Sequence, residues 1–173
     1  TWNGAWSGVP FAGIEVKVID EAGNEVPRGA QGEEISRGPH MFVGYLNERD
    51  RTDRALSDEG WFYSGDLCYM DEEGRIRING RKKEVIIRGG ENIYPLEVEN
   101  FLLTMPGVLD AQVVGIPDAK LGEIVGAFIR VRPGFEDMTE DDVRAYAIPR
   151  IARYKVPKRV FFVDDFPMTP SMK

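Results

Sequence analysis

The chain has 173 residues, of which 42% are hydrophobic and 29% are charged, and its formal net charge is −7. This composition is normal for a soluble globular protein with room for one ordinary domain or two small ones, and the negative charge argues against a general nucleic-acid-binding role. No apolar run is long enough to span a bilayer, and no basic-then-apolar leader opens the chain. We therefore expect a cytoplasmic protein without a transmembrane segment, and we leave peripheral membrane association open.

The cysteine and histidine content limits the chemistry further. Cys68 and His40 are the only residues of their types. A lone cysteine cannot form an intrachain disulfide, which fits a reducing compartment, and the two residues are too few for a zinc site built on them. A Ser-His-Asp or Cys-His hydrolase would have to use His40, and no nucleophile motif lies near it. Because both ends of the chain look cut, we expect it to be a piece of a longer protein.

The first half of the chain has the pattern of β structure. In residues 13–20, apolar side chains alternate with Glu15 and Lys17, as they do in a half-buried strand. The polar run 50–59 predicts a short helix, and the turn residues 71–74 predict a hairpin connection. The predicted strands of this half are residues 13–20, 33–37, 61–70 and 75–79.

Strand and helix patterns alternate in the second half. Pro95 suits the first position of a helix over residues 95–103, where Val98, Phe101 and Leu102 fall on one face. The predicted strands of this half are residues 84–88, 108–116, 125–132 and 159–163.

A second helix is predicted after Thr139, which suits the N-cap position and precedes three acidic residues. Pro149 should end or kink it. The order of elements predicts an α+β protein, in which residues 1–82 form a β-rich, barrel-like part and residues 83–173 form a small mixed α/β domain. We place the boundary near Lys83.

Ser64-Gly65-Asp66 is a turn-type tripeptide that ends in a carboxylate. An ionised carboxylate has two acceptor oxygens, which match the two donors of the vicinal ribose hydroxyls. Taken alone, the tripeptide is better explained as a surface Asx turn.

Three adjacent cations follow Gly80, and Arg81 in this run could form a forked pair of hydrogen bonds with ribose or phosphate oxygens. The alternative for this run is a solvated basic edge that protects a strand from aggregation.

Gly89-Gly90 lies between a predicted strand and a predicted helix. Paired glycines permit positive φ angles and a close approach of the backbone to an extended ligand. An ordinary strand-to-helix loop explains the pair about equally well, and the G-x-x-x-x-G-K-[ST] phosphate loop occurs nowhere in the chain. Lys173, taken alone, has the pattern of a solvated lysine.

Six segments in fixed order change these readings. They are Gly32-Glu33 with Gly38-Pro39 and Gly44-Tyr45-Leu46-Asn47; Gly60-Trp61 with Ser64-Gly65-Asp66; residues 80–99, GRKKEVIIRGGENIYPLEVE; Gly115-Ile116-Pro117-Asp118 with Gly122-Glu123; Tyr154-Lys155-Val156-Pro157; and Pro167, Thr169, Ser171 and Lys173. Together they resemble the adenylate-forming superfamily of acyl-CoA synthetases, firefly-type luciferases and nonribosomal-peptide adenylation domains. The resemblance covers nearly the whole chain and is most specific in residues 80–99.

The resemblance implies roles in an ATP-dependent reaction. Asp66 would hold the ribose hydroxyls of ATP, and Arg81 would contact the same ribose and phosphate region. Lys173 would be the lysine that stabilises the transition state of adenylation, in which a carboxylate attacks the α-phosphate and pyrophosphate leaves. Mg²⁺ would accompany ATP, and its ligand would come from outside this chain.

A second set of residues would serve thioester formation with CoA. Lys83 would be the hinge about which the C-terminal domain rotates between the two half-reactions. Arg88, Gly89, Gly90 and Glu91 would line the channel for the pantetheine arm once the domain has turned.

The chain departs from the family pattern in three respects. Met172 replaces the glycine that precedes the terminal lysine, which puts the placement of Lys173 in question. Pro149 interrupts a helix that usually continues. The family's Ser/Thr/Gly-rich phosphate loop and its Tyr-Gly-x-Thr-Glu segment, whose glutamate would hold Mg²⁺, would precede Thr1. Because these parts also build the acyl pocket, the chain does not encode the identity of its acid.

Three hypotheses remain open at this point. The first is an acyl-CoA synthetase for fatty or related carboxylic acids, which would use ATP and CoA and need the missing N-terminal domain as its partner. The second is a peptide-synthetase adenylation domain or a luciferase-like enzyme. The third is a non-catalytic, stand-alone domain. On the first hypothesis the isolated chain should be inactive, since the adenylation pocket needs the missing part.

Overall fold

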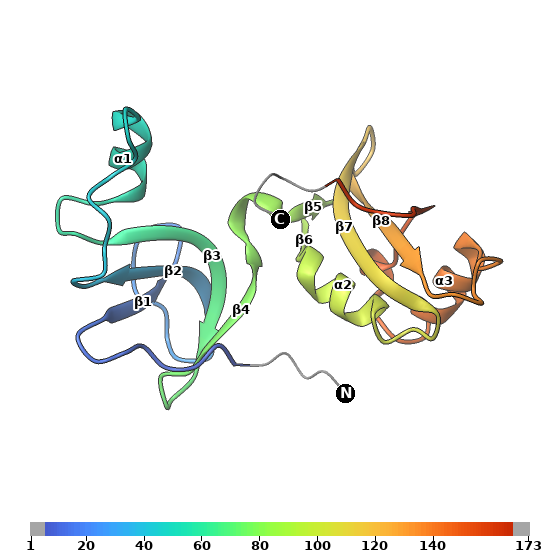
Figure 1. Ribbon diagram of the computed structural model, residues 1–173, viewed down its shortest axis with the longest axis horizontal. Coiled ribbons are helices and arrows are strands. Elements are labelled where there is room, and N and C mark those ends of the chain that lie inside the picture. The colour runs from blue at the N-terminus through green and yellow to red at the C-terminus, as the bar shows by residue number, and fades with distance from the viewer. Residues whose placement is uncertain (1–5, 168–173) are drawn as a thin grey trace. The chain divides into compact units, whose positions relative to one another are not determined.

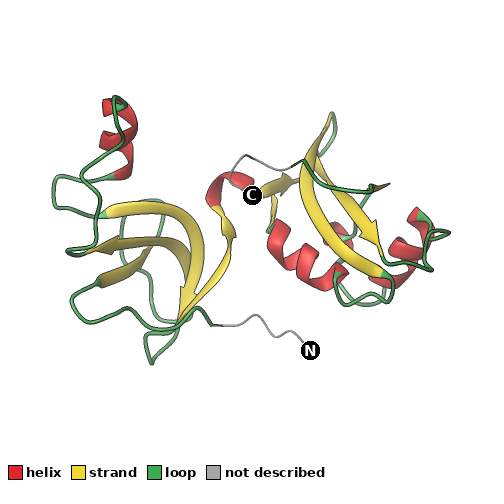
Figure 2. Cartoon of the chain, in the orientation of Figure 1, coloured by secondary structure: helices red, strands yellow, loops and turns green. Residues whose placement is uncertain are grey.

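The computed structural model describes residues 6–167, and in it the chain divides after Lys83 into two compact units. Helices occupy few residues of the first unit, whereas the second combines helices with a sheet (Figures 1 and 2). No helix among residues 6–167 is long and apolar enough to cross a membrane.

The first unit is built on an antiparallel sheet in which chain neighbours are also sheet neighbours, in the order β1-β2-β3-β4. Its elements are β1 (Glu15–Ile19), β2 (Gln31–Arg37), α1 (Arg49–Ala55), β3 (Phe62–Met70) and β4 (Ile76–Arg81). The predicted strands and the short helix of this half are therefore confirmed. The predicted hairpin also forms, because the Asp71 amide donates to the Arg75 carbonyl over 3.0 Å and closes the turn between β3 and β4.

Two small apolar clusters stabilise this sheet. Val18, Cys68 and Met70 form one of them. Ile19, Ile35 and Trp61 form the other. Because Val18 and Ile19 are consecutive in β1, their side chains lie on opposite faces of the sheet, so the two clusters cover different faces.

The second unit is a five-stranded sheet with helices packed against it. Its strands are β5 (Ile86–Arg88), β6 (Glu91–Ile93), β7 (Val108–Asp118), β8 (Gly122–Val131) and β9 (Arg159–Phe162), and its α-helices are α2 (Pro95–Leu102) and α3 (Glu140–Ala147). The order is β6-β5-β8-β7, and β9 pairs in parallel with β8. One core cluster contains residues from all five strands and both helices, among them Leu102, Ile129 and Val143.

Local signals set the ends of both helices as the sequence predicts. Pro95 stands at the start of α2. Thr139 caps α3, because its hydroxyl accepts from the Asp142 amide while the Asp142 carboxylate accepts from the Thr139 amide over 2.8 Å. This reciprocal capping box satisfies two donors that the helix leaves unpaired. The helix ends at Ala147, shortly before Pro149.

The region between the units differs from the prediction of one strand over residues 84–88. Lys82–Glu84 forms a turn of 3-10 helix, and the strand begins only at Ile86. The paired glycines close a two-residue hairpin between β5 and β6, so a strand-to-helix loop is the wrong description of them. Gly89 and Gly90 have φ angles of 59° and 89°. Positive φ at both positions gives the turn a twist that matches the flanking strands. Strands of three residues are too short to show alternation, which is why β6 escaped notice.

Candidate functional site

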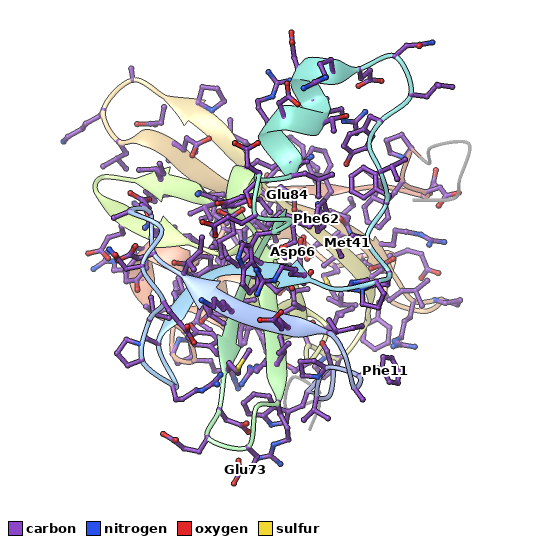
Figure 3. All side chains as sticks on the ribbon, turned by 90° about the vertical axis from the view of Figure 1, so that its left-hand side faces the viewer. Phe11, Met41, Phe62, Asp66, Glu73 and Glu84 are labelled. Atoms are coloured by element: carbon purple, nitrogen blue, oxygen red, sulfur yellow. The ribbon has the colours of Figure 1, made fainter. Side chains whose placement is uncertain are left out.

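Asp66 and Arg81 are the two residues that the sequence predicts as nucleotide contacts. They are direct cross-strand partners on β3 and β4. The Arg81 Nε lies 2.7 Å from the Asp66 Oδ1, and the two side chains are 51% and 28% exposed. Figure 3 shows Asp66 on the same strand as Phe62. The pair thus presents a carboxylate and a guanidinium together at the surface of the first unit.

The backbone around Asp66 is irregular, and hydrogen bonds from its neighbours hold it. The Asp66 amide donates to the Ser64 Oγ over 3.0 Å, and the Ser64 hydroxyl donates to the Glu34 carbonyl over 2.7 Å. Gly65 between them has a φ of 73°. The turn therefore depends on the serine, and the carboxylate of Asp66 points to Arg81, so a simple Asx turn does not describe this segment.

Glu33 is a site residue that our sequence reasoning named only as part of a motif. One of its oxygens, Oε1, accepts from the Gly65 amide over 3.3 Å. The other, Oε2, accepts from the Lys82 Nζ over 2.8 Å, and the Glu33 side chain is only 12% exposed. This hydrogen bond with Glu33 raises the pKa of Lys82. Lys83, the predicted hinge, is exposed and follows Lys82 in the 3-10 turn.

A second acidic side chain lies close to the same strand. Burial raises the pKa of Glu34, hydrogen bonds from Ser64 and Ser36 oppose that shift, and the negative charge of Asp66 adds to it. Burial, followed by the charges of Glu34 and Asp66, raises the pKa of the Cys68 thiol to about 12. Cys68 is fully buried, so the structure gives it the role of a small apolar core residue.

The predicted CoA-channel residues Arg88, Gly89, Gly90 and Glu91 all lie in the β5–β6 hairpin of the second unit. The Gly89 amide donates to the Leu121 carbonyl over 2.8 Å and thereby ties the hairpin to the turn before β8. A Cβ added at Gly90 would meet no atom within 4 Å, so the positive φ angle, and not crowding, requires glycine there.

Arg88 also lines a cavity of about 600 Å³ in the second unit. The other lining residues are Arg144, Ile148, Arg153, Tyr154, Val156, Pro157 and Lys158. Four of its eight lining residues are therefore cationic. Arg144 pairs with Glu140 and Asp141 and donates to the Lys158 carbonyl over 3.0 Å, so part of this positive charge is balanced locally. Sequence reasoning missed the cavity because its residues come from segments more than fifty positions apart.

Two further predictions concern residues beyond these groups. Lys173, the predicted adenylation lysine, lies outside the described residues. Among residues 6–167, no three His, Cys, Asp or Glu side chains gather as ligands for a metal ion.

The model of the family described as AMP-binding enzyme C-terminal domain matches residues 97–173. Residues 97–173 therefore match this domain family, and the whole chain is similar to the C-terminal part of adenylate-forming enzymes. The resemblance stated from the motifs, and the mixed α/β fold class, are thereby confirmed.

The similarity to individual proteins extends over nearly the whole chain. A medium-chain fatty-acid–CoA ligase of Escherichia coli is 46% identical over 96% of the chain, which spans 30% of that protein. The ATP-bound structure of MatB from Rhodopseudomonas palustris has a TM-score of 0.89 and 38% identity, over 95% of this chain and 33% of that one. The structure of o-succinylbenzoate CoA synthetase from Bacillus subtilis with its acyl-adenylate has a TM-score of 0.88 and 33% identity, over 97% of this chain and 34% of that one. The chain thus spans about a third of these relatives.

Proposed function

We propose that the protein to which this chain belongs is an AMP-forming acyl-CoA synthetase. A carboxylate and ATP give acyl-AMP and pyrophosphate, and the thiol of CoA then attacks the acyl-adenylate to give acyl-CoA and AMP. The observation that carries the proposal is the Asp66–Arg81 pair, which joins an acceptor for ribose hydroxyls to a donor for phosphate oxygens. The names of the similar ligases support the same reaction class.

In the first half-reaction, this pair would bind the nucleotide. The partly exposed Asp66 carboxylate would accept hydrogen bonds from the ribose hydroxyls, and Arg81 would turn its remaining donors to the ribose and phosphates. Lys173 would neutralise the charge that grows between the attacking carboxylate and the α-phosphate. Mg²⁺ would travel with ATP, and the donor set of the described residues offers it no site of its own.

In the second half-reaction, the second unit would supply the CoA site. Rotation about Lys83 would withdraw Lys173 and bring the hairpin from Arg88 to Glu91 to the acyl-adenylate. Because Gly89 and Gly90 carry no side chain, the pantetheine arm could approach their backbone closely. The cationic cavity beside Arg88 has a charge that suits the phosphate groups of CoA.

We further infer that the acid is a fatty or related carboxylic acid and that the enzyme works in the cytoplasm. The support for the acid is the 46% identity to a ligase named for medium-chain fatty acids. The parts that would enclose the acyl group would lie outside this chain, which spans 30% of that ligase. A panel of acids with the full-length enzyme, read as pyrophosphate release with each acid, identifies the substrate.

A matched pair of variants tests the nucleotide role of Asp66. Asp66→Asn in the full-length enzyme should raise the KM for ATP by about tenfold or more, since a charge-assisted hydrogen bond is worth roughly 1.5–3 kcal/mol. Asp53 is the control, because it also pairs with an arginine, Arg49, over 2.9 Å, but lies in α1. Equal effects of Asp66→Asn and Asp53→Asn on the KM for ATP would contradict the assignment.

Two more variants separate the half-reactions. Lys173→Ala should abolish pyrophosphate release yet spare thioester formation from supplied acyl-adenylate, because the lysine acts only in the first step. Lys83→Pro should impair one half-reaction more than the other, because it would favour one domain orientation. Equal loss of both steps in Lys173→Ala, or an unimpaired Lys83→Pro enzyme, would contradict these roles.

A carrier-protein thiol in place of CoA is the second candidate. It is favoured by 42% identity, over 96% of the chain, to a protein from Streptomyces coeruleorubidus named as a fatty acid–[acyl-carrier-protein] ligase. The two acceptors are distinguished by supplying CoA or a carrier protein to the preformed acyl-adenylate. Arg88→Ala should slow the reaction with CoA, because it removes one cation from the cavity.

A further inference from the structure

Two strand ladders meet beside Asp66, and both are irregular there. The β2–β3 register shifts between Glu33 and Ile35, and the β3–β4 register shifts between Leu67 and Cys68. At a bulge, backbone pairing no longer sets the spacing of neighbouring residues by itself. The β3–β4 ladder still pairs Asp66 with Arg81, but the register with β2 skips residues 64–66, so side-chain hydrogen bonds must hold this segment against β2.

The Glu33 carboxylate makes this connection. Its Oε1 accepts from the amide of Gly65, the residue directly before Asp66. Its Oε2 accepts from the ammonium of Lys82, the residue directly after Arg81. One side chain on β2 thus holds both members of the nucleotide pair through their immediate neighbours. Because the Glu33 side chain is 12% exposed, water competes little for its oxygens.

We propose that Glu33 is a positioning residue for the adenylation reaction, which orients Asp66 through Gly65 and fastens Lys82 to the first unit. This inference rests on the proposed function of Asp66 and Arg81. It assigns Glu33 no contact with ATP. It also limits the rotation, because a residue fastened by the largely covered Glu33 carboxylate stays with the first unit, which leaves Lys83 as the first residue free to turn.

The substitution Glu33→Met removes both hydrogen bonds but keeps an unbranched side chain of similar length. Glu33→Gln keeps an acceptor for the Gly65 amide and removes the charge that pairs with Lys82, and Lys82→Met removes the same ion pair from the other side. The cross-strand pair between Glu15 and Arg37, whose atoms approach to 2.8 Å, offers a matched control in Glu15→Met.

The test compares ATP with 2′,3′-dideoxy-ATP in the full-length enzyme, because the two nucleotides differ only in the ribose hydroxyls. The preference for ATP is measured from pyrophosphate release with each nucleotide. Asp66→Asn should abolish the preference for ATP. Glu33→Met should reduce the preference by about tenfold, whereas the KM for the acid and the melting temperature change little. Glu33→Gln and Lys82→Met should each reduce the preference for ATP by the same amount, which is smaller than the reduction in Glu33→Met. Glu15→Met should leave the preference unchanged.

The outcomes separate the inference from its premise. If Asp66→Asn keeps the preference for ATP, the proposed nucleotide site is wrong and the inference falls with it. If Asp66→Asn loses the preference but Glu33→Met and Glu33→Gln both keep it, the site stands and the positioning role is overturned. Should Glu33→Met fail to fold, Glu33→Gln and Lys82→Met decide, since unequal losses of preference in these two contradict a shared ion pair.

Discussion

The two units of this chain are stabilised in different ways. The second unit has one core to which every strand and both α-helices contribute. The first unit has two small clusters on opposite faces of its sheet, and its candidate site depends on bulges, ion pairs and the largely covered carboxylate of Glu33. It also exposes large apolar side chains more fully, with Val43 at 100%, Leu46 at 87% and Phe11 at 83%, whereas the maximum among residues 84–167 of the second unit is 62% at Ile148.

This difference bears on how the proposed enzyme would work. A domain that rotates must keep its shape without help from its neighbours, and a single core provides that. A nucleotide site needs charged groups in exact relative positions, and the first unit would obtain them from side-chain hydrogen bonds across irregular strands. The comparison therefore predicts that core substitutions will affect the units separately, and that polar substitutions near Asp66 will affect binding more than stability.

The largest expected effect concerns the small core of the first unit. Because the pKa of Cys68 rises from 9.0 to about 12, its thiolate fraction near pH 8 should fall about a thousandfold, and alkylation by iodoacetamide should slow at least as much. Mass spectrometry of the single cysteine measures the rate. Val43→Cys in a Cys68→Ser background supplies an exposed thiol in the same unit as control. Rapid labelling of native Cys68 would show that this core opens readily.

A core truncation tests whether the units unfold separately. Leu102 is fully buried in α2, so Leu102→Ala should destabilise the second unit by about 2–5 kcal/mol, whereas Leu103→Ala, at a 44% exposed position, should cost much less. All three tryptophans precede Lys83, so their fluorescence reports the first unit. In urea, Leu102→Ala should lower the unfolding midpoint that is followed by circular dichroism of the helices. The midpoint that is followed by tryptophan fluorescence should stay unchanged. A shared shift would mean that the units unfold together.

A cap substitution sharpens the same comparison with a smaller effect. Thr139→Ala removes the hydroxyl that accepts from the Asp142 amide, so the second unit should lose about 1 kcal/mol of stability. Thr139→Ser keeps the hydroxyl and should stay near wild type. The readout is the urea midpoint followed by circular dichroism. An equal loss in both variants would point to the methyl group and not to the cap.

The smallest expected effect is a pH dependence of the first unit. Burial raises the pKa of Glu34 in the folded state above 4.5. The folded protein therefore binds a proton at this side chain more readily than the unfolded chain does, and the free energy of unfolding falls as the pH rises from 4.5 through the folded-state pKa. Glu34→Gln should therefore raise the melting temperature followed by tryptophan fluorescence at pH 7 and change little below pH 4.5. The exposed Glu21→Gln should show no such difference. A gain independent of pH would refute burial as the cause.

Much of the fold was predictable because its signals are local. The Thr139 cap, the Pro95 helix start and the alternation in β1 each depend only on residues that are close together in the sequence. The start of β5 was predicted two residues too early, and β6 was not predicted, for the opposite reason. Three residues carry no period, and only the φ angles of Gly89 and Gly90 reveal the hairpin.

The sequence by itself determined the resemblance to adenylate-forming enzymes and predicted which residues would serve a nucleotide and a thiol, because carboxylates, cations and paired glycines stand in a recognisable order. Only the tertiary structure decided that Asp66 faces Arg81, that Glu33 holds the neighbours of both, and that Arg88 shares a cavity with Arg144 and Lys158. Strand register and bulges bring distant residues into contact, and they depend on packing across the whole sheet, which no short stretch of sequence records.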